Sequence, residues 1–351
     1  MRRIPPETLV NFGTALLKSK GLNEEDARYI AHCCVRTECF GVTTHGLRVL
    51  GHFDRDYGPD GEIRPDAKVK VVKQTPAAVV LDGRYCFGHV AMRETCSRAA
   101  ELARNGGVGL AAVINTNWMA GAGVFAAELA EQGLLARIWV QWCVGGATVP
   151  HGGLDGRFST NPMAIAFPTA DGDPVMADFS TSSLSYGRSR KLADSGGTTP
   201  EPVYRNPDGT LSDDPQDMVD GDAAMLPTGG VNYGYKGMSL SLWQEALTAA
   251  TGGAANNPEH REKPDGKQNV QVLAIDPQQL AGKEYFENEM SRLVRHVRTS
   301  RPVDAESPVR LPGERAFALE RECLSQGVPV SDERLEQLNQ IAENNNIPPL
   351  R

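Results

Sequence analysis

The chain of 351 residues contains no apolar run close to the roughly 20 residues that a bilayer-spanning helix needs. Its first residues, Met1–Pro6, include no apolar stretch of the kind that begins a secretory signal. We therefore expect neither membrane association nor secretion, and we predict a cytoplasmic protein.

Paired cysteine motifs are missing as well. The cysteine count is odd, and no Cys-x-x-Cys pair occurs, which is typical of reduced, buried thiols rather than of a disulfide framework. No cluster of histidine and cysteine has zinc spacing, and no Asp-rich loop resembles a calcium site, so the sequence predicts no metal. The seven cysteines are Cys33, Cys34, Cys39, Cys86, Cys96, Cys143 and Cys323.

Runs of lysine and arginine are absent, and the net charge at pH 7 is −8. We therefore expect no nucleic-acid partner. Hydrophobic residues make up 40% of the chain and charged residues 23%, which is ordinary for a folded globular protein. The length is enough for two compact lobes, or for one large domain with an appendage.

The order of the expected elements favours a mixed sheet with helical flanks over a doubly wound unit, because strands and helices alternate only partly. Asn23, followed by three acidic residues, predicts the start of a helix. Residues 187–230 are rich in Gly, Pro, Asp and Thr and are expected to form a long ordered loop, and residues 256–266 a mobile one. Strands are expected at 69–72, 77–83, 108–114, 134–141, 164–168, 175–178 and 271–277, and helices at 6–21, 23–39, 90–105, 121–132, 237–251, 284–299, 313–326 and 332–344.

The stretch Gly121–Ala126 reads Gly-x-Gly-x-x-Ala, like the phosphate-binding turn of a dinucleotide fold. In that turn the first glycine follows a strand at once, and an acidic residue ends the next strand. Here residues 115–120 intervene, and the next strand ends in Gln141-Trp142-Cys143. We therefore interpret these glycines as sites of close helix packing. A phosphate-binding P-loop motif is also absent.

The run Thr44-His45-Gly46-Leu47-Arg48 is the most informative part of the chain. A histidine supplies a proton near neutral pH, and an arginine clamps a carboxylate with two parallel hydrogen bonds. We expect Thr43 or Thr44 to cap a helix that carries His45, Arg48 and His52 on one face. The alternative is a helix start with solvated side chains.

Three further segments are candidates for ligand contact. Asp178–Ser182 places a carboxylate and three hydroxyls after a buried strand, and Tyr235-Lys236 opens a helix beside free backbone N–H groups. Asn161 can both donate and accept hydrogen bonds, and His151 is a candidate second acid. The alternatives are a polar turn, a solvated lysine and a structural loop histidine.

In their order and spacing, these segments resemble the malate/L-lactate dehydrogenase family of the non-Rossmann kind. That family also includes ureidoglycolate and sulfolactate dehydrogenases, diketogulonate reductase and piperideine-2-carboxylate reductase. The resemblance runs from about Leu9 to Val330. It rests on 44–48, 81–83, 150–153, 160–164, 178–182, 206–209 with 214–215, 226–230, 235–237, 274–277 and 311–314.

The resemblance implies an α+β, non-Rossmann NAD(P)-binding fold with a mostly antiparallel central sheet flanked by helices. It implies a discontinuous helical domain from both chain ends (1–70 and 283–351), a central NAD(P)-binding sheet domain (71–282) and a homodimer. His45 matches the family's proton donor, Arg48 its carboxylate anchor, and Thr44 a neighbouring hydroxyl. Cofactor contacts are expected at Asp178, Phe179, Ser180, Thr181, Ser182, Tyr235, Lys236, Pro312, Gly313 and Glu314.

One departure concerns Trp118, which stands where the family usually has a histidine. An indole carries no transferable proton but can stack on a planar ring, so we expect a cofactor contact there. We predict an NAD- or NADP-dependent oxidoreductase that transfers hydride at C2 of a small carboxylate, with Arg48, Thr44, Asn161 and His151 as substrate contacts. Two alternatives stay open: a reductase of a cyclic 2-imino acid, and a family-like scaffold that has lost catalysis.

Overall fold

The protein is described by a computed structural model that covers residues 1–55, 63–142, 146–170, 172–256 and 268–350. Within these residues no helix is both long and apolar enough to cross a membrane. All but Asn256 of the loop expected at 256–266 lies outside the described residues.

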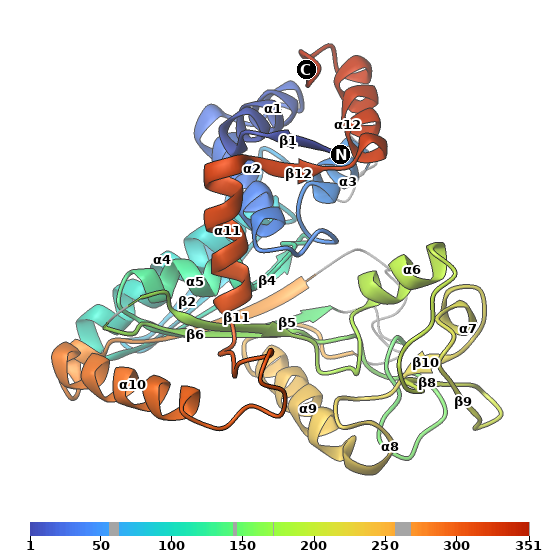
Figure 1. Cartoon of the computed structure of the whole chain (residues 1–351). Coiled ribbons are helices and arrows are strands. Elements are labelled where there is room, and N and C mark those ends of the chain that lie inside the picture. The colour runs from blue at the N-terminus through green and yellow to red at the C-terminus, as the bar shows by residue number, and fades with distance from the viewer. Residues whose placement is uncertain (56–62, 143–145, 171, 257–267, 351) are drawn as a thin grey trace.

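The centre of the molecule is a seven-stranded sheet with the order β2-β3-β4-β11-β5-β6-β7 (Figure 1). Among these strands only the β3–β4 pair is parallel, and the other pairs are antiparallel. The expectation of a mostly antiparallel sheet is confirmed. The strands are β2 (Lys70–Gln74), β3 (Ala78–Asp82), β4 (Val108–Thr116), β5 (Leu135–Trp142), β6 (Met163–Phe167), β7 (Val175–Phe179) and β11 (Gln268–Ile275).

One face of the sheet is covered by α4 (Gly88–Gly106) and α5 (Gly123–Glu131), as Figure 1 shows. Small residues let α4 lie close to β4, and a Cβ on Gly109 would overlap the backbone of α4 at Ala99. The other face carries α9 (Tyr235–Ala250), whose buried residues are mostly polar. A short helix η2 (Pro277–Gln279) follows β11.

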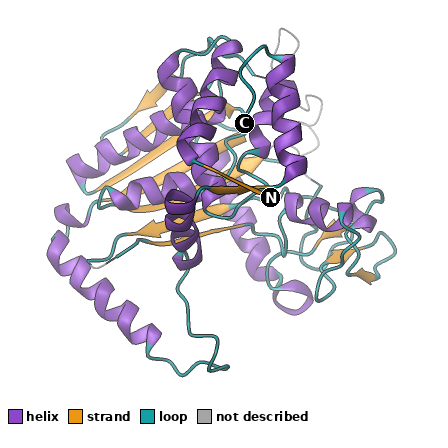
Figure 2. Cartoon of the chain, turned by 45° about the horizontal axis from the view of Figure 1, so that its top comes forward, coloured by secondary structure: helices purple, strands orange, loops and turns teal. Residues whose placement is uncertain are grey.

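The two chain ends meet on the helical side of the molecule (Figure 2). Strand β1 (Arg2–Ile4) pairs antiparallel with β12 (Val328–Val330). One hydrophobic core contains residues of both ends, which agrees with a helical unit built from them. Its helices are α1 (Pro6–Ser19), α2 (Glu24–Cys39), α3 (Arg48–Arg55), α11 (Glu314–Gln326) and α12 (Asp332–Asn344).

Helix α10 (Lys283–Arg298) lies away from α1, α3 and α12, next to the turn between β6 and β7 (Figure 1). There the Ala170 backbone N–H donates to the Ser291 hydroxyl at 3.2 Å. The domain boundaries at 70 and 283 stay a prediction.

Residues 187–230, expected to form a long ordered loop, are ordered but also contain short helices and strands. The segment folds around its own small core of Val203, Tyr204, Met218, Ala223 and Met225. Its elements have two to nine residues, mostly too short to produce a recognisable hydrophobic period in the sequence. They are α6 (Tyr186–Asp194), β8 (Tyr204–Arg205), β9 (Leu211–Ser212), α7 (Gln216–Val219), β10 (Ala224–Met225) and α8 (Gly230–Tyr233).

Candidate active site

The turn that carries His45 begins where α2 ends. The expected cap by Thr43 or Thr44 was wrong, because α3 starts only at Arg48. The carboxylate of Glu38, at the end of α2, instead accepts a hydrogen bond from the Leu47 backbone N–H at 2.8 Å. A side-chain acceptor at a helix start satisfies a backbone donor that has no intrahelical partner. Glu38 therefore ties the turn to α2.

Gly46 is required for this contact. A Cβ on Gly46 would overlap the Glu38 carboxylate and lie 2.8 Å from the Glu38 Cα. The turn also orients the histidine, since the Thr44 hydroxyl oxygen lies 2.8 Å from His45 Nδ1. With Nδ1 engaged in this way, Nε2 is the nitrogen left for a ligand.

A cavity of about 430 Å³ opens beside the turn. Its wall brings together Thr44, His45 and Arg48 with residues that are remote in the sequence. The expected cofactor contacts Trp118, Asp178, Phe179 and Ser180 line the same cavity. Six further lining residues were not selected as ligand contacts from the sequence, although Thr160 lies in the segment 160–164 that carries the family resemblance. They are Asn117, Trp142, Ser159, Thr160, Tyr186 and Arg190.

Trp118 forms an aromatic wall between two histidines. Its ring centroid lies 5.5 Å from that of His45 and 5.1 Å from that of His52. His45 and His52 both line the cavity, although His45 lies in the turn before α3 and not on the helix that was expected to carry both. Gly88 lets the chain pass closely behind this wall, because a Cβ there would lie 2.6 Å from the Trp118 carbonyl.

The electrostatics of the cavity favour an anion. Burial, with Arg48 and His52 nearby, lowers the pKa of His45 to about 4, so the imidazole is neutral at pH 7. No hydrogen bond or ion pair holds the Arg48 guanidinium within the described part of the chain. An arginine without a carboxylate partner that lines a cavity is suited to a carboxylate ligand.

Asp178 links the sheet to α5. One of its oxygens accepts a hydrogen bond from the Gly123 backbone N–H at 2.7 Å, at the start of the helix. Desolvation raises the pKa of this carboxyl to about 6. The backbone N–H groups of Gly123 and Ala122 favour the ionised form and partly oppose this rise. A Cβ on Gly123 would lie 3.1 Å from Asp178, so close packing explains this glycine as expected.

Several of the expected contacts make hydrogen bonds within the protein, and their ligand roles stay predictions. Asn161 is fully buried and donates to Glu245 at 2.8 Å, because a polar layer between α9 and the sheet holds it. Thr181 is also buried, and its hydroxyl lies 2.8 Å from that of Ser241. The Ser182 hydroxyl donates to the Leu184 carbonyl.

The remaining expected contacts lie outside the cavity wall. His151 lines a separate cavity of about 150 Å³, and its ring centroid is 6.0 Å from that of Tyr235. Lys236 is exposed, with its ammonium 5.2 Å from the Tyr233 ring. The Pro312 carbonyl accepts from the Met176 N–H on β7, Gly313 packs on Met176, and Glu314 pairs with Arg298. Their ligand roles stay predictions.

Comparisons with known proteins identify the family of the chain. The chain is 28% identical to a malate dehydrogenase of Pyrococcus abyssi over 345 residues. This alignment covers 97% of this chain and 94% of that protein. It is 30% identical over 333 residues to a pyrroline-2-carboxylate/piperideine-2-carboxylate reductase of Pseudomonas syringae pv. tomato, covering 92% and 91%. The structure matches that of malate dehydrogenase from Entamoeba histolytica with a TM-score of 0.92 at 22% identity, covering 99% of both chains.

These relatives are dehydrogenases and reductases, and the chain is an oxidoreductase of that class. The malate/L-lactate dehydrogenase family model matches residues 4–339, and the chain belongs to this family. The resemblance found in the sequence is thereby confirmed.

Gly46→Ala tests the contact that positions the turn. Because the new methyl group would overlap Glu38, we expect the free energy of unfolding to fall by about 1–3 kcal/mol, measured by denaturant titration. Gly106→Ala, near the end of α4, is the matched control: no atom lies within 4 Å of its Cβ position. It should raise stability by about 0.4–1 kcal/mol. Equal effects of the two substitutions would contradict the packing argument.

Proposed function

We propose that the protein transfers hydride between NADH or NADPH and C2 of a small 2-oxo or 2-hydroxy carboxylic acid. The observation that supports this most is that His45 and Arg48 line one cavity. His45 can move a proton and Arg48 can hold a carboxylate. A small 2-oxo acid needs the first at the oxygen on C2 and the second at its carboxylate.

The cavity wall is compatible with a planar cofactor ring. Phe179 and Trp142 are apolar aromatic residues, yet 40% and 38% of their surfaces are exposed. Both line the cavity together with Trp118, so a flat ring finds several aromatic faces there. A bound nicotinamide would supply the hydride. The described residues favour neither NAD nor NADP.

Arg48 and His45 act in sequence on the substrate. Arg48 binds the substrate carboxylate, and this anion offsets the positive charge that helps to lower the His45 pKa. Substrate binding therefore raises the pKa of His45 toward neutrality. In the reductive direction His45 Nε2 then donates a proton to the oxygen on C2, while Thr44 holds Nδ1 and fixes the ring. In the oxidative direction the neutral imidazole accepts that proton.

We further propose a homodimer that uses the outer side of α8 and α9. Five large apolar side chains on this side are 45% to 59% exposed, whereas the buried side of α9 is polar. Exposed apolar patches of this kind mark interaction sites on soluble proteins. These residues, which we call the α8–α9 face, are Val231, Tyr233, Tyr235, Leu242 and Trp243.

A reducing, cytoplasmic location is part of the proposal. Six cysteines in the described residues are buried and free, and none of the six forms a disulfide.

The second candidate is reduction of a cyclic 2-imino acid. Trp118 favours it, because the indole adds an aromatic wall but no acid beside His45. A protonated imine already carries the proton that a ketone must obtain from the enzyme. This substrate class therefore needs less acid assistance than a 2-oxo acid.

His45→Ala and Arg48→Ala should have different kinetic effects. Losing the proton donor should lower kcat by about 10²–10⁴-fold. Losing the carboxylate anchor should raise KM by about 10–100-fold, the equivalent of one charged hydrogen-bonded contact. Steady-state assays of NAD(P)H consumption measure both. His296→Ala and Arg188→Ala, which alter exposed residues outside the cavity, should leave both constants unchanged.

Near-normal kinetics in both variants would remove the assignments.

The low pKa of His45 predicts a pH dependence. The kcat/KM for reduction should fall as pH rises through the neutral range, whereas the kcat/KM for oxidation should stay flat. Calorimetry with NADH and NADPH distinguishes an enzyme with other catalytic residues from a scaffold that has lost catalysis. The enzyme would bind a cofactor, whereas the scaffold would bind neither at millimolar concentration.

A substrate panel separates the two candidate reactions. If the first holds, pyruvate or oxaloacetate should give a higher kcat/KM than piperideine-2-carboxylate with the same reduced cofactor. If the imine reductase is correct, the order should reverse, because Trp118 supplies no second acid beside His45. Equal rates would mean that the cavity does not discriminate between the two.

Trp243→Glu tests the dimer, because a buried charge on the α8–α9 face would oppose association. Sedimentation velocity should show a dimer for the wild type and at least a tenfold weaker association for the variant. Leu324→Glu on α11 is the control, since Leu324 is 66% exposed and lies outside this face. A wild-type monomer would contradict the proposal.

A further inference from the structure

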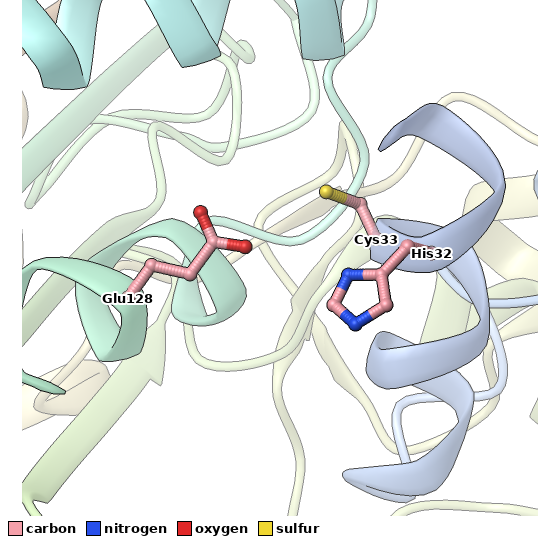
Figure 3. Close-up of side chains that lie close together, drawn as sticks. All are labelled: His32, Cys33 and Glu128. Atoms are coloured by element: carbon pink, nitrogen blue, oxygen red, sulfur yellow. The ribbon is translucent and has the colours of Figure 1, made fainter. Parts of the chain in front are cut away.

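A second group of chemically active side chains lies outside the cavity, between α2 and α5. It consists of His32 and Cys33 on α2 and Glu128 on α5, shown in Figure 3. A histidine nitrogen, the cysteine sulfur and a glutamate oxygen all lie within 4.8 Å of one another. None of the three lines the cavity that holds His45, so the proposed hydride transfer does not use them.

The donor set matches one class of ligand. Nitrogen, sulfur and oxygen donors together are typical of Zn²⁺, which binds them at about 2.0–2.3 Å with tetrahedral geometry. That geometry places the donors roughly 3.3–3.6 Å apart. Donor atoms separated by as much as 4.8 Å therefore need to approach one another by about 1 Å, which side-chain rotation can provide. The three side chains already converge on one gap between the helices (Figure 3).

Tyr29 orients the Glu128 carboxylate, and the guanidinium of Arg36 is bound by two other carboxylates. The Tyr29 hydroxyl donates to Glu128 Oε2 at 3.1 Å, which leaves Oε1 for a metal. Hydrogen bonds of this kind from outside the ligand set fix the position of a ligating carboxylate. The nearby guanidinium of Arg36 is held by Glu131 and by Glu320 at 2.7 Å. Glu128 and a Cys33 thiolate would supply two negative charges for one divalent cation.

We propose that His32, Cys33 and Glu128 bind one zinc ion. Cys33 releases its thiol proton to solvent on binding, and its sulfur then bonds to the metal. His32 is exposed, so the ion can enter from its side, and a water molecule completes the fourth position.

The ion would connect two elements that position the active site. Helix α2 ends at the turn that carries His45, and the start of α5 is held by Asp178. A metal bond between α2 and α5 therefore acts as a brace for this region and takes no part in hydride transfer. Its expected effect is on stability, which can be measured apart from activity.

The experiment uses the full chain after treatment with a chelator, titrated with Zn²⁺ in a calorimeter. We expect one zinc per chain, and Co²⁺ in its place should give the charge-transfer absorption of a cobalt–thiolate bond. Zinc should also raise the midpoint of thermal unfolding, as any ligand specific to the folded state does. Absence of stoichiometric zinc binding would overturn the proposal.

Substitutions test whether zinc binding depends on the proposed ligands and not on a neighbouring cysteine. His32→Gln changes an exposed side chain and should fold normally, so we expect it to weaken zinc binding at least tenfold. Cys33→Ser should abolish the cobalt–thiolate absorption. Cys34→Ser is the matched control, because Cys34 is equally buried on the same helix but contacts His89. Wild-type affinity in both His32→Gln and Cys33→Ser, or a loss in Cys34→Ser alone, would contradict the assignment.

Discussion

The hydrogen bond from the Leu47 backbone to the Glu38 carboxylate is the contact on which the site depends. It joins the end of α2 to the turn before α3 and thereby fixes where His45 and Arg48 stand. Burial raises the pKa of Glu38, while the Leu47 N–H favours its ionised form. The contact requires a glycine at position 46, because any side chain there would occupy the space of the carboxylate. One partly buried acid thus replaces the hydroxyl cap that the sequence suggests.

A second acid, Asp178, has a similar role at another part of the cavity wall. It lies one residue before the end of β7 and holds the first backbone N–H of α5, so sheet and helix are fixed relative to each other at the cavity. The stretch Gly121–Ala126 looks like a phosphate-binding turn, but at Gly123 it serves this helix–sheet contact. Two carboxylates that accept backbone hydrogen bonds therefore position segments that line the cavity. Trp118 then fills the space between His45 and His52 with an aromatic ring.

Polar residues buried between α9 and the sheet, among them Gln141, Asn161 and Glu245, explain the place of Asn161 and the outward apolar side of α9. Glu245 accepts hydrogen bonds from Gln141 at 3.0 Å and from Asn161 at 2.8 Å, so buried polar groups on α9 and the sheet satisfy one another. This removes Asn161 from the cavity although its sequence context resembles a site. It also turns the apolar residues of α9 outward, which reverses the usual amphipathic pattern of a surface helix.

The sequence by itself determined the long elements and the family. The helix cap at Asn23 and the long helices and strands could be recognised, because local hydrogen bonding and hydrophobic period leave a signal over neighbouring residues. The mostly antiparallel order of the sheet was expected from the family resemblance. Only the tertiary structure decided that Glu38 caps the turn, that Asn161 belongs to the framework and that Arg190 faces the cavity. The same holds for Glu128, which joins His32 and Cys33 from another helix. These contacts unite residues that are distant in the chain, and a single sequence carries no periodic or spacing signal for such pairs.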